Sequence, residues 1–382
     1  MRVAVFLATN LKSNRDVLRG IQNYCRAGRA ASPWSFLIAW PEMTPLKVVA
    51  KWAPDGIIAK MYTPRMIAAL RRFKVPVVNT TNIAGDRTIP RAAVDEEAVG
   101  RMAAEHFLER GFRNFAYVGY RQQRSESARK EWFRATLRRA GYGCHAYTGI
   151  DLFALRPGGT WGFRDKKLIA WLTALPKPVA IFLYHDVLAW EILEVCRSIG
   201  LRVPEDVALL GADDDELFCD LSQPPLSSIA YPAERIGFAA AGLLDGLLRR
   251  RPAPKKPVLI APVGVVTRQS TDMVAIEDRE LAAAVRFIRQ NGSGPIGVKS
   301  ILNHVQISRR TLEQKFRETL GRSPLDEIIR VRVEQARQLL ARTDLSMPEI
   351  AARSGFSNAE RLSVVFKDKT GISPTQYRKT HS

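Results

Sequence analysis

Residues 308–324 read SRRTLEQKFRETLGRSP, and residues 358–374 read NAERLSVVFKDKTGISP. The two segments match at an offset of 50 residues, with a Leu and a Phe four residues apart and a Gly-x-Ser-Pro ending in each. Upstream the offset falls to 49, where Ile301 corresponds to Ile350, so the second copy has one more residue in its turn. A repeat this regular predicts a duplicated supersecondary unit.

Each copy has the order short apolar helix, tight turn, longer helix, which predicts helix-turn-helix units at about 298–320 and 347–370. The Leu and Phe of each longer helix face inward, and the polar side chains point away. Arg and Gln bind purine edges, Glu accepts from cytosine, Val contacts the thymine methyl, and further cations hold phosphates. The candidate DNA-binding residues are Arg309, Arg310, Glu313, Gln314, Arg317, Asn358, Glu360, Arg361, Ser363, Val364 and Lys367. The alternative is a plain helical bundle with solvated cations.

One long helix is predicted between the two units, from Pro324 to about Arg342. Its apolar stripe comprises Leu325, Ile328, Ile329, Val333, Ala336, Leu339 and Leu340. A rigid connector of this kind would place both units in successive major grooves on one face of DNA. Together with the ending Gly371–Arg378, residues 280–382 resemble the DNA-binding domain of AraC-type regulators, and the resemblance implies double-stranded DNA as a partner.

Residues 1–270 alternate short apolar runs with amphipathic segments, which predicts parallel sheets covered by helices. The predicted strands are 3–8, 35–39, 56–59, 75–79, 91–94, 114–119, 143–147, 179–183, 207–211, 258–260 and 263–267. The predicted helices include 14–26, 96–110, 125–139, 187–199 and 233–249. This length exceeds one α/β layer, so the fold class expected is a two-lobed α/β core followed by the all-α domain. Residues 271–279 form the expected linker.

Ligands of parallel sheets bind beyond the carboxyl ends of the strands. The candidate ligand-binding residues near such ends are Asn10, Arg15, Arg129, Asp186 and Asp213. Carboxylates that accept and arginines that donate hydrogen bonds suit a polyhydroxylated ligand. Alternatively, Asp186 only caps the next helix, Arg129 is a surface charge, and Asp213–Glu216 is a metal or catalytic site.

The segments 180–186, 200–214 and 225–229 resemble the core of LacI-type repressors and periplasmic sugar-binding proteins. That resemblance implies a clamp with the effector between two lobes, in which Asp186, Asp213 and Arg129 hold a sugar. His185 stands where the family usually has Asn.

A LacI-type core joined to an AraC-type domain is an uncommon pairing. Nearly the whole chain resembles bacterial sugar regulators that have it, in particular at Arg129, at Phe133-Arg134 and at 227–229. The resemblance implies a homodimeric activator of pentose catabolic genes that binds D-xylose and contacts RNA polymerase. Two rival hypotheses are an enzyme built on Asp213–Glu216 and a regulator controlled by a partner protein or by a non-sugar ligand such as a purine.

The chain has 382 residues and a formal net charge of +20, which favours an anionic partner such as nucleic acid. Its four cysteines are too widely spaced for a CxxC or zinc pattern, which predicts reduced thiols. The run Val3–Ala8 is too short for a signal peptide, and there is no apolar run of membrane-spanning length. A cytoplasmic protein without cofactor or metal is expected.

Gly292–Gly297 fits GxGxxG, but a helix rather than a strand is predicted before it, so nucleotide binding is not expected.

Overall fold

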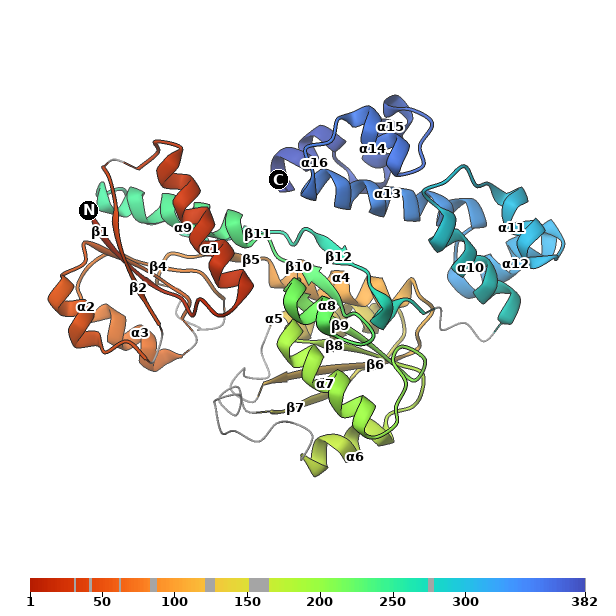
Figure 1. The fold of residues 1–382 in the computed structure, drawn as a ribbon, viewed down its shortest axis with the longest axis horizontal. Coiled ribbons are helices and arrows are strands. Elements are labelled where there is room, and N and C mark those ends of the chain that lie inside the picture. Colours follow the sequence, from red (N-terminus) through yellow and green to blue (C-terminus); the bar gives the residue numbers. More distant parts are fainter. Residues whose placement is uncertain are drawn as a thin grey trace.

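Three bodies make up the chain in the computed structural model: two α/β lobes and a helical domain (Figure 1). The structure describes residues 1–30, 32–40, 43–61, 63–82, 88–120, 128–150, 165–273 and 278–381. Within these ranges no helix is long and apolar enough to cross a bilayer.

Lobe 1 is built on a parallel sheet of order β2-β1-β3-β4. Its strands are β1 (Arg2–Phe6), β2 (Ser35–Ala39), β3 (Gly56–Ala59) and β4 (Val77–Asn79). Its helices are α1 (Lys12–Arg26), α2 (Leu46–Trp52), α3 (Pro64–Arg71) and, from much later in the chain, α9 (Ala233–Leu248). Glycines let α1 and α9 touch, because a Cβ on Gly20 would come 1.8 Å from the Glu234 carbonyl oxygen.

Lobe 2 is built on a sheet of order β12-β10-β9-β8-β6-β7, in which only the β10–β12 pair is antiparallel. Its strands are β6 (Asn114–Tyr120), β7 (His145–Ile150), β8 (Val179–Leu183), β9 (Val207–Asp213), β10 (Ser227–Ala230) and β12 (Gly264–Val266). Its helices are α4 (Glu96–Leu108), α5 (Ala128–Arg139), α6 (Lys166–Ala174), α7 (Asp186–Ser198) and α8 (Glu216–Leu221), and the short η3 (Gln269–Thr271) follows β12. A separate parallel pair, β5 (Ala92–Val94) with β11 (Val258–Ile260), is also formed.

The predicted two-lobed α/β core is confirmed, and each predicted strand overlaps an observed one. For β10 the sequence predicts no strand, because two of its four residues are serines and do not form an apolar run. The predicted helix at 125–139 begins at Ala128 among the described residues, and positions 125–127 lie outside them.

The helical domain contains the two predicted helix-turn-helix units. Its helices are α10 (Arg279–Asn291), α11 (Val298–Val305), α12 (Arg309–Leu320), α13 (Pro324–Arg342), α14 (Met347–Arg353), α15 (Ala359–Thr370) and α16 (Pro374–His381). Backbone angles repeat with the sequence: φ is +66° at Gly321 and +80° at Gly371, where α12 and α15 end. Each turn also contains one residue of positive φ, Gln306 at +53° in the first and Gly355 at +81° in the second.

Helix α13 belongs to two apolar cores, one for each unit. Ile328 packs in the first core, with Leu312 and Phe316, and Ala336 packs in the second. Leu325 departs from the predicted stripe: its side chain is 54% exposed, because it lies in the first turn of α13, before the helix reaches either core.

Candidate functional site

The loop that follows β1 in lobe 1 contacts the loop that follows β9 in lobe 2, and the region around this contact, termed the cleft, is the candidate ligand site. Ser13, in lobe 1, donates its hydroxyl hydrogen to Asp213 Oδ2 over 3.5 Å. The amide of Lys12 donates to Asp215 Oδ2 at 3.2 Å, and its ammonium lies 3.3 Å from Glu216. Asp213 has a φ of +106°, a strained conformation of the kind that concentrates at functional sites. Burial raises the pKa of Asp213, and the positive charges of Lys60 and Arg129 oppose that rise.

Asp186 joins three segments of lobe 2. Its Oδ1 accepts from the Ser228 hydroxyl at 2.6 Å, and its Oδ2 accepts from the Asp215 amide at 2.8 Å. The capping alternative does not describe it, because His185 caps α7 by accepting from the Leu188 amide through Nδ1. Burial and then Asp213 raise the pKa of Asp186. Each carboxylate oxygen has a second lone pair, so Asp186 retains capacity for a ligand hydrogen bond.

Arg129 is buried, not a surface charge, with 3% of its area exposed. Its Nε and Nη2 donate to the two oxygens of Glu96 at 2.7 and 3.0 Å, and Nη1 donates to the Tyr184 carbonyl oxygen. The guanidinium carbon lies 4.4 Å from the ring centre of Tyr184 and 5.3 Å from that of Tyr231. A guanidinium has five N–H donors, so two remain for a ligand.

Tyrosines and a histidine complete the lobe 2 side of the cleft. The Tyr120 hydroxyl lies 2.9 Å from His185 Nε2. Burial, Lys60 and Arg129 lower the pKa of His185 to about 3, so the ring is neutral at physiological pH. The hydroxyls of Tyr231 and Thr80 are buried without a hydrogen-bond partner among the described residues. A buried hydroxyl without a protein partner is available for a hydrogen bond to a polar ligand or to water.

The lobe 1 side differs in detail from the prediction. Asn10 and Arg15 are exposed, and Arg15 Nη1 donates to the carbonyl oxygens of Thr9 and Asn10 at 3.0 and 2.9 Å. Arg15 thereby shapes the loop after β1. The buried polar side chain here is Asn14, which donates to the Ala8 carbonyl oxygen and accepts from Lys60 Nζ at 3.1 Å.

Sequence reasoning missed several of these groups. Glu96 and Tyr231 lie outside the segments that resemble the family. Tyr184 lies within segment 180–186, but nine tyrosines left the aromatic contacts unassigned. Two of the groups follow directly after a strand, Lys60 after β3 and Tyr231 after β10. Their place at the carboxyl ends of strands could have indicated a role in ligand binding.

Two carboxylates of the acidic run after β9 are bound to other parts of the protein. Asp214 pairs with Arg268 at 2.9 Å, and Asp215 caps α8 through the Leu217 amide. Among the described residues no group of three His, Cys, Asp or Glu side chains is arranged to hold a metal ion. The four cysteines are free thiols, of which Cys196 and Cys219 are buried.

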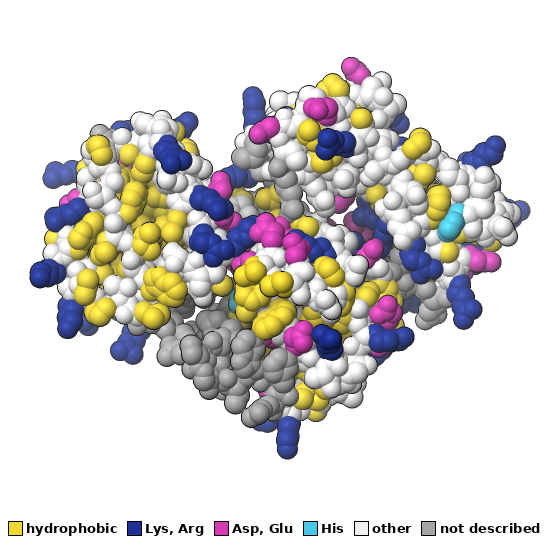
Figure 2. Space-filling view, viewed as in Figure 1, with side chains coloured by type: hydrophobic (Ala, Val, Ile, Leu, Met, Phe, Trp, Pro, Cys, Tyr) yellow, Lys and Arg dark blue, Asp and Glu magenta, His cyan; other side chains and the backbone are white. Residues whose placement is uncertain are grey.

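The second candidate surface is formed by α12 and α15. On α12, Arg309, Arg310, Gln314 and Arg317 are exposed and Glu313 is partly exposed. Two pairs along the helix hold these side chains: Arg309 with Glu313, and Gln314 with Glu318, each at 2.9 Å. Figure 2 shows Lys and Arg side chains spread over the visible faces of all three bodies, so charge alone does not locate a DNA-binding face.

Helix α15 offers fewer groups for base recognition. Asn358 caps the helix by accepting from the Arg361 amide at 2.8 Å. Glu360, Arg361 and Lys367 are exposed, Ser363 is partly exposed, and Val364 is an apolar side chain that is 63% exposed.

The GxGxxG match is not a nucleotide loop. It follows α10 rather than a strand, and the carbonyl oxygens of Gly292 and Gly294 accept from Arg332 of α13 at 2.9 Å each.

Comparison with known proteins gives matches over most of the chain. Residues 2–89 match a family described as XylR N-terminal domain, residues 104–271 match a periplasmic binding protein-like domain, and residues 301–380 match a helix-turn-helix domain. The xylose operon regulatory protein of Escherichia coli K12 is 30% identical over 100% of this chain and 97% of its own length. The protein of the same name from Haemophilus influenzae is 28% identical over 99% and 98%. A solved structure of the xylose-binding transcription activator xylR is 29% identical, with a TM-score of 0.61 over 100% of this chain and 98% of that one.

Proposed function

The chain belongs to the family of xylose operon regulatory proteins, and on this premise we propose that it is a transcription activator whose binding to DNA responds to D-xylose. Residues 1–270 are assigned to the effector domain, 271–279 to the linker and 280–382 to the DNA-binding domain, whose first helix, α10, begins at Arg279. It works in the cytoplasm as a homodimer on double-stranded DNA, contacts RNA polymerase, and catalyses no reaction.

The observation that carries the effector proposal is the placement of Arg129. Glu96 orients its guanidinium between the rings of Tyr184 and Tyr231, and the Tyr231 hydroxyl is buried without a partner among the described residues. A sugar offers hydroxyls that donate and accept together with an apolar ring face, and this arrangement matches both. Asp186 and Asp213, which also belong to lobe 2, supply hydrogen-bond acceptors.

Closure of the lobes is proposed as the response to sugar. Ligand shifts the equilibrium only by its differential affinity for the closed form, so residues of both lobes must contact it. Lobe 1 offers the loop of Asn10 and Arg15, and Lys60 beside Asn14.

Calorimetry with D-xylose, L-arabinose and D-ribose tests the effector. We expect D-xylose to bind most tightly and Tyr231→Phe to weaken it about three- to tenfold, the loss of one neutral hydrogen bond. Tyr142→Phe is the matched control, because Tyr142 precedes β7, at the opposite ends of the strands, and packs on Phe115. Absence of heat with all three pentoses would refute the effector, and a panel of purines and other metabolites would then identify the ligand class.

A further inference from the structure

The amino end of helix α4 contributes Glu96, the partner of Arg129, to the proposed sugar site. Asp95 caps it by accepting from the amides of Glu97 and Ala98, and Glu96 in its first turn holds Arg129. Helix α5, which carries Arg129, lies against α4 at Gly100, where a Cβ would come 2.3 Å from the Arg129 carbonyl oxygen. The 13 residues of α4 span about 20 Å at a rise of about 1.5 Å per residue. One helix therefore connects the partner of Arg129 with the other end of α4.

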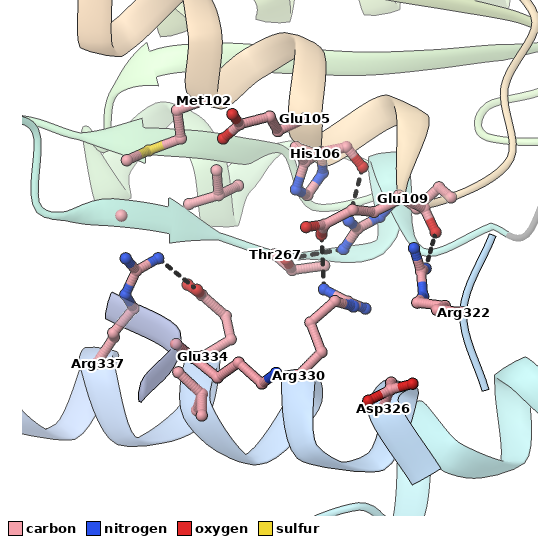
Figure 3. A pocket seen from close by; sticks show the side chains of 15 residues that line it. Met102, Glu105, His106, Glu109, Thr267, Arg322, Asp326, Arg330, Glu334 and Arg337 are labelled. Atoms are coloured by element: carbon pink, nitrogen blue, oxygen red, sulfur yellow. Dashed lines mark hydrogen bonds and ion pairs between the residues drawn. The ribbon is translucent and has the colours of Figure 1, made fainter. Parts of the chain in front are cut away.

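The carboxyl end of the same helix contacts the DNA-binding domain (Figure 3). The carbonyl oxygen of Glu109, the C-cap residue of α4, accepts from Arg322 at 3.0 Å and from Arg289 at 3.3 Å. Its carboxylate accepts from Arg330 Nη1 at 2.6 Å. The last carbonyls of a helix lack intrahelical partners and carry partial negative charge, so Arg322 and Arg289 stabilise this helix end, while Arg330 pairs with the side chain.

A buried carboxylate organises those arginines within the DNA-binding domain. Glu327 has no exposed surface and lies 2.7 Å from Arg322, 2.8 Å from Arg330 and 4.0 Å from Arg289. Burial acts to raise the pKa of Glu327, but Arg330 and Arg322 outweigh it and lower the pKa to about 2. Glu327 thus holds the arginine side chains in the positions from which they contact lobe 2, so less side-chain entropy is lost when the two domains dock.

The edge strand of lobe 2 provides a second contact. Gln338 of α13 donates to the Val265 carbonyl oxygen at 2.9 Å, and the Tyr377 hydroxyl of α16 donates to that of Val263 at 2.8 Å. The DNA-binding domain therefore bonds one backbone carbonyl of β12 and one of the residue just before it, along an edge that has no further strand.

A cavity of about 440 Å³ remains between α4, β12 and α13. Acidic and basic side chains line it from both domains, among them Glu105, Glu109, Arg330 and Arg337. Acidic and basic side chains face each other here, and Arg330 pairs with Glu109 across the two domains. This arrangement is typical of a polar interface between domains, whereas a site for a single ion would be lined by charges of one sign.

Docking leaves the reading surfaces open. Arg310 and Arg317 of α12 and Lys367 of α15 are exposed while Glu109 is bonded. The contact therefore does not cover the DNA-reading helices within one chain. What it fixes is their direction relative to lobe 2.

We propose that the carboxyl end of α4 is the docking site of the DNA-binding domain, and that Glu109 couples the direction of the two reading helices to occupancy of the cleft. The coupling half of this inference rests on the proposed sugar response, whereas the docking half stands without it. Because binding free energies are linked reciprocally, weaker docking must change sugar affinity.

The docking half is tested without sugar or DNA, by hydrogen exchange of the full chain. Glu109→Ala is expected to speed exchange at the carboxyl end of α4 and in the 322–330 segment by about three- to tenfold, as loss of one partly exposed charged hydrogen bond. The control is Glu97→Ala, on the same helix, where the carboxylate lies 3.9 Å from Arg101 and not at the interface. Both sites are partly exposed, so both variants should fold. The Glu109 carbonyl oxygen remains in this variant, so unchanged exchange would overturn docking through the Glu109 carboxylate and Arg330.

The coupling half is tested by D-xylose calorimetry on the same two variants. Glu109→Ala should change the dissociation constant by about fivefold or more, and Glu97→Ala should leave it unchanged. Faster exchange together with unaltered sugar affinity would overturn the coupling but keep the docking site. If the unmodified chain binds no pentose, the proposed effector fails, and the exchange experiment still decides the docking.

Discussion

At the scale of single residues, α12 carries the richer base-reading chemistry. Gln314 is exposed near the middle of α12 and donates to Glu318, so binding a base requires exchange of that hydrogen bond. Arg317 is exposed in the last turn of the helix. Residues near the amino end of a recognition helix contact bases, whereas cations farther along are suited to phosphates.

These two residues therefore lead to different expected outcomes. Gln314→Ala should relax specificity at one base pair, by about 1–3 kcal/mol between the preferred and the wrong base. Arg317→Ala should weaken specific and random DNA alike and reduce the slope of log affinity against log salt by about one. Titrations at several salt concentrations with operator and scrambled duplexes measure both effects, and equal losses on both duplexes for both variants would contradict the assignment.

At the scale of elements, the two turns of the repeat each contain one residue of positive φ, but they differ in length and in surroundings. Gly355 sits where the repeat has Gln306, and a Cβ on it would come 2.8 Å from the Gly292 carbonyl oxygen and 2.8 Å from Arg332 Nε. The second turn thus packs on the loop between α10 and α11, which Arg332 also holds. This contact ties the two units together in addition to α13.

Gly355→Ala should therefore destabilise the domain more than Gly321→Ala. At Gly321 the added Cβ meets nothing within 4 Å, so only the left-handed conformation costs about 1 kcal/mol. At Gly355 the same conformational cost is joined by a clash with backbone, and a total of about 2–4 kcal/mol is expected. Urea unfolding of the two variants measures the difference, and equal midpoints would show that the loop yields at no cost.

The sequence predicted the elements better than their contacts. Apolar periodicity and the repeat located the sheets, the two units and α13, since these depend on local pattern. Strand β10 and the exposure of Leu325 were not predicted, because two serines interrupt the apolar pattern of β10 and the first turn of a helix carries little pattern. In the cleft, strand ends indicated Asp186 and Asp213, yet the Glu96 partner of Arg129 comes from another helix and leaves no trace in local spacing.

At the scale of the whole molecule, the interface between core and DNA-binding domain shows the same limit. In the sequence, Arg322, Glu327 and Arg330 look like charges on a solvated helix. The structure buries Glu327 and turns both arginines towards Glu109, more than 200 positions earlier. Lobe 2 and the DNA-binding domain are thereby joined through α4 and β12, so movement of the lobes also moves the reading helices relative to lobe 1.

The spacing of the two reading helices makes a final prediction about DNA. The 19 residues of α13 span about 28 Å, comparable to the roughly 34 Å of one DNA turn. With α13 and the Gly355 contact both fixing that distance, five base pairs inserted between the subsites of α12 and α15 put the second subsite on the opposite face of the duplex. We expect affinity to fall at least about tenfold, because the base contacts of one unit are lost. Ten inserted base pairs restore the face but not the distance, so affinity should stay low. Gel-shift titration of a footprinted operator with zero, five and ten inserted base pairs measures this, and recovery at ten would mean that the connection between the units stretches.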